Sequence, residues 1–453
     1  MSVQLKTLLV LSLFLFLAAS PALAEELTLA GAIEMALESN HLVRAAAYDT
    51  SAADWGFRRS FSSWLPRVYF NTTWSRPDPD TLDAADEAYE TMRLFDTSAE
   101  RTLYENNYSS SLSVIQPLFN GGVEYFAIRA ASISRDRARL TEEDARLQII
   151  LQVKKIYFGA LKSKALLRVA EESLLLARES LKMMRARLEV GQVTRSEVLR
   201  WEAEVATAEG ARVEAENAYA QTMMQLANIL GRSINEEFEL PALPEDVEPA
   251  DLLRAEQATS AGVDVPLQVS RHPSVRAMAG NVELAEVENR QTWGTLLPNV
   301  NFSYTYNWQT NDTMMPDEDT SWTMGIGVEI PLFQGLSAVT GIGQTRRQVE
   351  SVRLQVEDYR RNFVQQAYAA RLNLRTARLR VLSARKARRH SAANLEIVQS
   401  RNQLGMVTQL ELLDAQLAYK RAQSQLIAAV SDFYIALADW EYVVASLQGE
   451  SED

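Results

Sequence analysis

The side chains best suited to chemistry in this chain are carboxylates placed beside hydroxyls, and the pattern occurs twice. Thr194 is followed three residues later by Glu197, and Thr408 is followed at the same spacing by Glu411. This spacing is a capping box, in which the two side chains bond the first free amides of a helix. A further carboxylate, Asp414, lies one turn beyond Glu411, past the capping positions. The pattern predicts two helix starts, the second with an extra acid.

Patterns that support catalysis or metal binding are missing from the sequence. There is no cysteine, which excludes disulfides, thiolate metal sites and a lipid-modified N-terminal cysteine. His41, His272 and His390 share no metal-ligand spacing, and the first two lie at equivalent places of the internal repeat described below. No nucleophile elbow, phosphate loop or zinc-protease signature occurs. We predict a protein that is not an enzyme and needs no cofactor.

Both capping boxes belong to an internal duplication. LPRV at 65–68 recurs as LPNV at 297–300, an offset of 232, and QPLF at 116–119 recurs as IPLF at 330–333, an offset of 214. Each half reads as strand, loop, strand, very long helix, tight turn and returning helix. We predict a first repeat at 25–230, a proline-rich acidic connector at 231–266, a second repeat at 267–446, and a disordered tail at 447–453.

The N-terminus indicates export. Lys6 precedes an apolar run at 8–19 and the small-residue pattern Ala22-Leu23-Ala24, which together predict a signal peptide at 1–24. A transmembrane anchor is the alternative, but the run is too short to cross a hydrocarbon core of ~30 Å. The net charge of -13 becomes -14 when Lys6 is removed, which argues against binding to nucleic acid.

Four segments have the alternation of half-buried strands. Val300, Phe302, Tyr304, Tyr306 and Trp308 alternate with small polar residues, and 322–330, 68–74 and 108–114 repeat the pattern. Strands of ~9–11 residues with one apolar and one small polar face are typical of a transmembrane barrel with a wet lumen. A soluble sandwich is the alternative, but the rest of the chain offers no second sheet.

Four strands cannot close a barrel, and an open sheet edge in lipid would leave amides unpaired. Several chains must therefore share one barrel. Two chains would supply eight strands and three would supply twelve, and the strand count leaves both open.

The helical segments are unusually long. Residues 123–190 contain one glycine and no proline, and at 1.5 Å per residue they would span ~100 Å. An equivalent helix follows Gly335, and shorter helices are expected at 28–63 and 194–230. Seams spaced three and four residues apart predict coiled-coil packing. We predict a mainly α-helical fold with a β-barrel part.

These features resemble the TolC-type outer-membrane efflux proteins. The turns read VGQVTRSE at 190–197 and LGMVTQLE at 404–411, and the mature chain opens with LTLAGAIEMAL at 27–37. The resemblance extends over essentially the whole mature chain. It implies a homotrimer with a shared twelve-stranded barrel in the bacterial outer membrane and a helical tunnel in the periplasm. It also implies a periplasmic adaptor protein that links this channel to an inner-membrane pump.

The resemblance also implies roles for the turns. The tunnel tips would dock the adaptor through Val190, Gly191, Thr194, Glu197, Leu404, Gly405 and Thr408. Glu411 and Asp414 match the acidic pair at the periplasmic entrance of family members, although capping alone also accounts for Glu411. Asn402 and Val407 replace a tyrosine and an arginine that make closing contacts in some relatives. Closure here would then depend more on coiled-coil packing.

We expect a passive outer-membrane exit duct of a tripartite efflux or secretion system. A duct for type I protein secretion is one alternative, and a periplasmic coiled-coil scaffold is an alternative of another class. The acidic segment 78–100 is expected to be a solvated loop, with divalent-cation binding as its alternative. The basic run at 385–389 is expected to be an exposed helix face.

Overall fold

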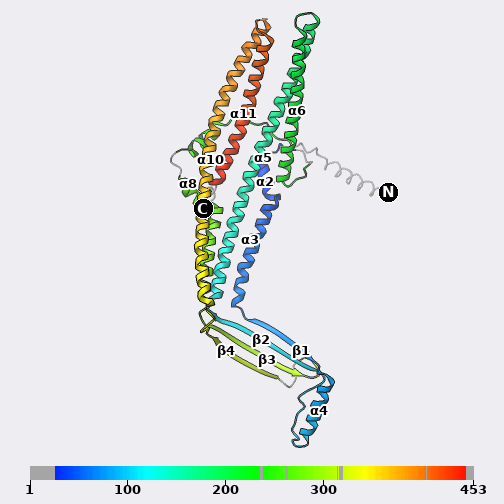
Figure 1. The fold of residues 1–453 in the computed structure, drawn as a ribbon, viewed down its shortest axis with the longest axis vertical. Coiled ribbons are helices and arrows are strands. Elements are labelled where there is room, and N and C mark those ends of the chain that lie inside the picture. Colours follow the sequence, from blue (N-terminus) through cyan, green and yellow to red (C-terminus); the bar gives the residue numbers. More distant parts are fainter. Residues whose placement is uncertain are drawn as a thin grey trace, which may run out of the picture. The chain divides into compact units, whose positions relative to one another are not determined.

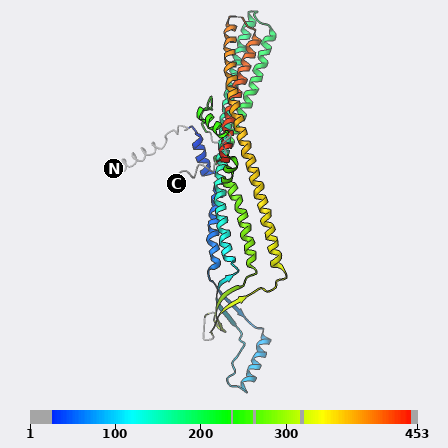
Figure 2. The same ribbon diagram turned by 90° about the vertical axis from the view of Figure 1, so that its left-hand side faces the viewer.

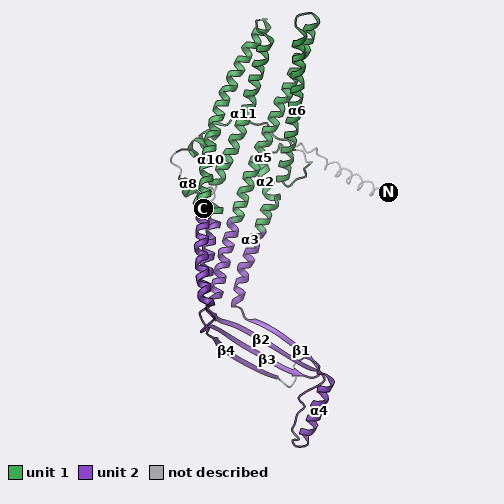
Figure 3. Cartoon of the chain, viewed as in Figure 1, with its two compact units in different colours: residues 1–47, 141–275, 360–453 green, residues 48–140, 276–359 purple. Residues whose placement is uncertain are grey.

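The computed structural model describes residues 26–234, 238–260, 264–313, 315, 320–404 and 406–444. The expected signal peptide at 1–24, the expected tail at 447–453 and Gly405 lie outside the described residues. The chain forms two compact units (Figure 3). Unit 1 comprises residues 1–47, 141–275 and 360–453, and unit 2 comprises residues 48–140 and 276–359.

Unit 2 contains one four-stranded antiparallel sheet (Figure 1). Its strands follow chain order, and they are β1 (Arg67–Ser75), β2 (Asn107–Asn120), β3 (Asn299–Thr310) and β4 (Thr320–Glu329). All four predicted strands are therefore confirmed. Every residue of β1 and β4 is exposed, which is expected of the two edge strands in a single chain.

The register of the sheet places the apolar residues on one face. Val68, Val114, Tyr304 and Met324 are aligned across the four strands in one row. The neighbouring row of the other face is Tyr69, Ser113, Thr305 and Thr323. Aromatic side chains also pack along the apolar face, where the rings of Phe70 and Trp308 stack with centroids 5.8 Å apart. The predicted division into an apolar and a small polar face is therefore confirmed.

The strands join the long helices at glycines. Gly121 and Gly122 have φ of 58° and 80°, and Gly335 has φ of 61°, which are left-handed values that glycine adopts without steric cost. Gly121 also lies against the backbone of Gly294. A Cβ added to Gly121 would therefore clash, since it would lie 2.1 Å from the Gly294 oxygen. Glycine therefore makes the turn from strand to helix in both halves of the chain.

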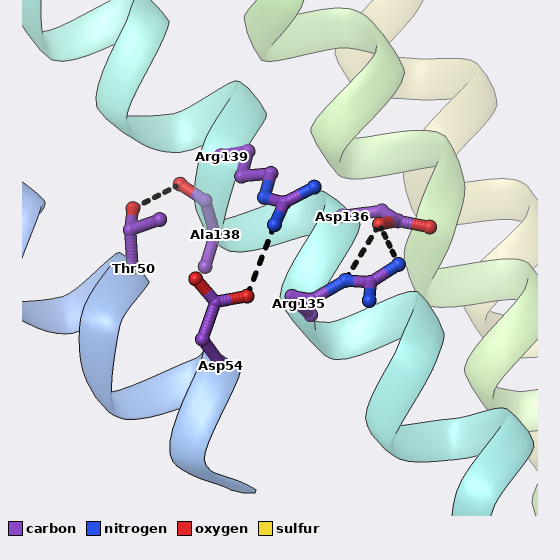
Figure 4. Close-up of polar contacts among 6 residues, drawn as sticks. All are labelled: Thr50, Asp54, Arg135, Asp136, Ala138 and Arg139. Carbon is purple, nitrogen blue, oxygen red and sulfur yellow. Dashed lines mark hydrogen bonds and ion pairs between the residues drawn. The ribbon is translucent and has the colours of Figure 1, made fainter. Parts of the chain in front are cut away.

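Parts of longer helices also belong to unit 2, and polar contacts join them in pairs. They include parts of α3 (His41–Ser60), α5 (Val123–Glu189), α9 (Pro273–Gly294) and α10 (Ser337–Gln403). Thr50 on α3 donates to the Ala138 carbonyl at 3.3 Å, and Asp54 pairs with Arg139 at 3.1 Å (Figure 4). Asn289 on α9 donates to the hydroxyl of Thr345 on α10 at 2.8 Å.

Helices α5 and α10 have 67 residues each, and both contribute to the two units. Each is followed by a returning helix, α6 (Arg195–Ile229) or α11 (Gln409–Val444). The long and returning helices that the sequence predicts are thus present in both halves. In Figure 2, α10 and α11 run side by side within unit 1. No helix in the described part of the chain is both long and apolar enough to cross a lipid bilayer.

The helix expected at 28–63 is divided. The structure has α2 (Leu29–Ser39), α3 and a short 3-10 helix (Phe61–Trp64). Asn40 is extended between α2 and α3, its side chain donates to the Ile229 carbonyl, and its Oδ1 accepts from the Leu42 amide. An asparagine that bonds nearby backbone groups in this way competes with a continuous helix. His272 occupies a similar break between α8 (Val265–Arg271) and α9.

His272 has a structural role. Its side chain is fully buried, and its two ring nitrogens lie 2.9 Å from the Ser274 hydroxyl and 3.1 Å from the Tyr442 carbonyl. Burial lowers the pKa of His272, because removal from water disfavours the charged ring. His41, by contrast, is exposed.

The connector contains α7 (Pro249–Ala258), and its acidic residues form ion pairs with arginines of α10. Arg378 pairs with Glu256 at 2.8 Å, Arg385 pairs with Asp246, and Arg388 lies 3.7 Å from Glu245. The run at 385–389 therefore holds the connector with two of its side chains, and is not only a solvated face. Acids of the connector and bases of α10 lie far apart in sequence, so the run alone does not reveal this pairing.

The acidic segment at 78–100 also differs from the expected loop. It begins with α4 (Pro79–Arg93), a helix that Asp78 caps by accepting from the Thr81 amide at 3.1 Å. Asp86 on this helix pairs with Arg101. No group of three or more His, Asp or Glu side chains in the described part of the chain is placed to hold a metal ion.

Candidate functional site: two hairpin tips

The first hairpin tip joins α5 to α6. The Gln192 amide donates to the Arg187 carbonyl at 2.9 Å and the Gly191 amide donates to the Leu188 carbonyl at 3.0 Å, which is the bonding of a Schellman motif. Gly191 has φ of 70°, and a Cβ added to it would meet nothing within 4 Å. The backbone conformation, and not crowding, therefore requires glycine here.

The capping box at the first tip is complete. The Thr194 amide donates to a Glu197 carboxylate oxygen at 2.7 Å, and the Glu197 amide donates to the Thr194 hydroxyl at 3.4 Å. The hydrogen bond from the Thr194 amide, followed by that from its hydroxyl, lowers the pKa of Glu197. The Glu197 carboxylate therefore caps the N-terminus of α6.

The second tip, between α10 and α11, is built in the same way. The Met406 amide donates to the Arg401 carbonyl at 2.9 Å, which repeats the longer bond of the first tip. The Thr408 amide donates to a Glu411 oxygen at 3.0 Å, and the Glu411 amide donates to the Thr408 hydroxyl at 3.2 Å. The predicted capping geometry is confirmed at both tips.

Apolar side chains lie exposed at the outer end of both tips. Val190 is 68% exposed, Leu404 is 70% exposed and Met406 is 65% exposed. Met406 was not among the docking residues expected from the sequence, which did include Val190 and Leu404. Exposed apolar residues on a turn with fixed backbone geometry provide a surface that another protein can cover.

A small core lies behind the tips. Met184, Val198, Trp201 and Leu413 are buried together, so that α5, α6 and α11 are joined near their ends. Met184 lies on α5, for which the sequence predicted coiled-coil packing. Trp201 was not predicted, although its place one turn after Glu197 on the capped helix is a signal for a buried anchor.

The two acids of the second tip differ in their surroundings. Glu411 is exposed and serves as the cap of α11. Asp414 is also exposed, and it has neither an ion pair nor a hydrogen bond in the described part of the chain. Near them, the Gln409 side chain donates to Asn402 at 3.4 Å, so Asn402 makes a contact within its own hairpin. The arrangement offers negative charge and binding surface, but no group poised to make or break bonds.

Comparison with known proteins identifies the family. A family model described as "Outer membrane efflux protein" matches residues 32–232 and 266–439. The chain belongs to the outer membrane efflux protein family. The outer membrane efflux protein BepC of Brucella suis biovar 1 is 26% identical over 345 residues, covering 74% of this chain and 71% of BepC. The alkaline protease secretion protein AprF of Pseudomonas aeruginosa is 24% identical over 419 residues, covering 89% and 81%.

Solved channels share the fold at low sequence identity. A CusC structure matches with a TM-score of 0.76 and 14% identity, covering 92% of this chain and 91% of that one. The open state of the Neisseria gonorrhoeae MtrE outer membrane channel matches with a TM-score of 0.75 and 19% identity, covering 92% and 88%.

Family membership confirms the main functional predictions. The protein is a passive outer-membrane exit duct, it is not an enzyme, and its helices form a periplasmic tunnel. It works as a homotrimer with a periplasmic adaptor and an inner-membrane pump. Three chains of four strands make a twelve-stranded barrel, which settles the choice that the strand count left open. In such a barrel the apolar face of the sheet meets lipid and the small polar face lines the lumen.

Proposed function

We propose that the two hairpin tips are the adaptor-docking end of this duct and that Glu411 and Asp414 line its periplasmic entrance. The docking residues are those of the two turns, Val190, Gly191, Thr194, Glu197, Leu404, Gly405 and Thr408, together with Met406. The observation that carries the proposal is the exposure of Val190, Leu404 and Met406 on two turns of matching construction.

Matched turns suit a trimeric duct with six tips. Each chain contributes two tips with the same capping box, so a trimer presents six similar turns. An adaptor that recognises the common part of the turn can then bind at each of them. Gly191 and the capping threonines fix the turn, while the apolar residues supply the contact.

The entrance acids act by charge. Three copies of Glu411 and Asp414 place six carboxylates at the entrance of the trimer. A ring of carboxylates in a pore attracts cations, and divalent ions can bridge carboxylates of neighbouring chains. Capping does not remove the charge of Glu411, so this residue can serve both purposes.

Conductance measurements test the entrance. Glu411→Gln/Asp414→Asn should lower cation selectivity and divalent block in a planar bilayer while the trimer persists, because glutamine can still accept the capping bond from Thr408. Glu171→Gln/Glu179→Gln is a matched control, since both of these acids are exposed on α5. Unchanged selectivity in the first variant, with the trimer intact, would remove Glu411 and Asp414 from the pore.

Photo-crosslinking in cells tests the docking surface. A photoreactive residue at Val190 or Met406 should capture the adaptor, whereas one at Leu253, which is 59% exposed in the connector, should capture much less. Equal capture at all three positions would show that the tips are not the preferred contact.

Protein secretion is a second candidate for the cargo. AprF, a protease secretion protein, aligns with 89% of this chain, whereas BepC, an efflux protein, aligns with 74%. A deletion strain separates the two. Loss of a polypeptide from the medium with unchanged drug susceptibility would indicate secretion, and increased susceptibility with unchanged secreted proteins would indicate efflux.

A further inference from the structure

The two repeats have the same joint between two consecutive helices. Asn40 ends α2 just before α3, and His272 ends α8 just before α9, at positions that differ by 232, the offset of the repeat. Their backbones agree, with φ and ψ of -66° and 126° at Asn40 and of -61° and 135° at His272. We call residues 39–42 the first joint and residues 271–274 the second joint.

The Asn40 side chain bonds the first joint to the returning helix of its repeat. Its amide nitrogen donates to the carbonyl of Ile229, the last residue of α6, at 3.3 Å. Its Oδ1 accepts from the backbone amide of Leu42, two residues further on, at 2.9 Å. One side chain thus supplies a donor toward the returning helix and an acceptor toward its own chain.

His272 makes the same pair of bonds at the second joint. Its Nδ1 accepts from the backbone amide of Ser274, two residues further on, at 3.3 Å. Its Nε2 lies 3.1 Å from the carbonyl of Tyr442, in the last turn of α11. A backbone amide can only donate, so Nδ1 must be unprotonated. The one proton of the neutral ring is therefore on Nε2 and is donated to Tyr442.

The two joints differ because only the second can take up a proton. An asparagine side chain does not titrate, whereas an imidazole with its ordinary pKa of ~6.5 does so near neutral pH. A proton on Nδ1 would point toward the amide hydrogen of Ser274, and the bond between them would be lost. Burial lowers the pKa of His272, so the folded chain favours the neutral ring that makes both bonds.

One carboxylate is placed to accept a hydrogen bond from the protonated ring. Oδ1 of Asp144 on α5 lies 4.0 Å from Nδ1 of His272, and it accepts from the Tyr442 hydroxyl at 3.0 Å. The Asp144 side chain is 13% exposed, so water reaches the carboxylate beside the buried ring. The Asp144 charge acts against burial, since it favours the charged form of the histidine.

The other groups against the ring are uncharged. The ring of Phe363 on α10 lies with its centroid 4.6 Å from that of His272, and the ring of Tyr442 lies 5.0 Å away. Charged residues that flank these contacts in the chain are exposed or paired elsewhere, and they are Arg271, Arg360, Arg361 and Glu441. Among the described residues, Asp144 is therefore the charge that the ring meets.

We propose that the second joint is an acid-sensitive switch, in which a proton taken up at Nδ1 of His272 replaces the bond from the Ser274 amide with a bond to Asp144. The first joint keeps its bonds under the same conditions, because Asn40 cannot take up the proton. Acid thus loosens the end of α11 and the start of α9. The proposal is independent of the docking and entrance roles proposed above, which concern the opposite end of α11.

Linkage sets the direction and the size of the effect. The folded pKa of His272 lies below the unfolded value of ~6.5, so its contribution to stability is full above that value and is lost as the pH falls below it. Opening of the joint then takes up one proton. Its equilibrium constant rises about tenfold at most between about pH 7.5 and about pH 5.5.

Hydrogen exchange of the detergent-solubilised full chain tests the switch, with rates corrected for the effect of pH on free amides. Over that pH range the protection of amides at the second joint should fall about three- to tenfold. Protection at the first joint, measured in the same sample, should stay constant. An equal change at the two joints, or an unchanged second joint, would overturn the proposal.

His272→Asn gives the second joint the residue of the first. This variant should keep its protection at neutral pH and lose the dependence on pH, since an amide can make both bonds. His272→Leu is the matched control, because it makes neither bond and should be poorly protected at every pH. A pH profile of His272→Asn that matches the wild type would assign the proton uptake to another group.

Asp144→Asn provides a second measurement if His272→Asn assembles poorly. The asparagine can still accept from the Tyr442 hydroxyl, but it offers no charge to the protonated ring. The fall in protection at the second joint should then be larger than in the wild type. A fall that is equal or smaller would contradict the exchange of bonds from Ser274 to Asp144.

Discussion

The two hairpin tips have a common backbone and different charges. Both begin their returning helix with a threonine and a glutamate in a capping box. Three residues after the glutamate, the second tip has Asp414, while the equivalent position of the first tip is Arg200. Only the second tip therefore has two acids one turn apart. The capping box is common to both turns and starts their helices, whereas Asp414 is found only at the second tip.

The tips also differ in how they are anchored. Trp201 of the first tip is 4% exposed in the core behind the tips, and its equivalent on α11 is the small residue Ala415, which is equally buried. The first hairpin thus contributes the large side chain that α5, α6 and α11 share. We infer that the first tip supports the second.

The largest effect should follow removal of that anchor. Trp201→Ala deletes a buried aromatic side chain, and such changes cost ~3–5 kcal/mol in unfolding free energy. Hydrogen exchange should show faster opening of both tips, since Leu413 of the second hairpin packs in the same core. Val190→Ala is the control, because Val190 is exposed. Faster exchange confined to α6 would show that the tips are independent.

A pair of glycine substitutions should change stability in opposite directions. Gly191→Ala forces a left-handed conformation on a residue with a Cβ, at a cost of ~1–2 kcal/mol. Gly159→Ala lies inside α5 with open space around the added Cβ and should stabilise that helix by ~0.5–1 kcal/mol. Denaturant midpoints of the solubilised protein measure both changes. A stabilising Gly191→Ala would contradict the Schellman geometry of the first tip.

Much of this fold follows from local patterns, while several features depend on distant partners. The alternation after Pro298 and the proline-free run of α5 are local, and both predicted the observed elements. The break at Asn40 depends on a carbonyl of Ile229, 189 positions away. The pairing of Arg385 with Asp246 likewise joins segments 139 positions apart. Local sequence patterns do not reveal such contacts between distant residues, because the fold brings the partners together.

The candidate site shows the same division. The capping boxes were predictable because Thr194 and Glu197 interact within one turn. The core around Trp201 was not, since three helices form it.

Loss of a single cap should have a smaller effect. Thr194→Ala and Thr408→Ala should each cost ~1 kcal/mol, because each leaves helical amides unsatisfied. Amide exchange at the start of α6 and α11 can measure the two costs separately. A cost at one tip only would contradict the matched construction of the two turns.

The smallest expected effect concerns pH. The folded pKa of Glu197 lies below its unfolded value, so its contribution is present above the unfolded pKa of ~4.3 and is lost as the pH falls through the folded pKa. Exchange at the start of α6 should therefore rise in that acid range. Glu197→Gln should remove this part of the pH dependence, and persistence of the same profile in the variant would assign it to another group.

The most direct test of the account gives the second tip the charge of the first. Asp414→Arg reproduces at the second tip the residue found at position 200 of the first. If Asp414 lines the entrance of a trimeric duct, the reversal potential in a salt gradient should move from cation preference toward anion preference in a planar bilayer. The variant should keep its trimeric mass, because Asp414 is exposed and lies outside the capping box. A trimer with an unchanged reversal potential would contradict the placement of this hairpin at the entrance.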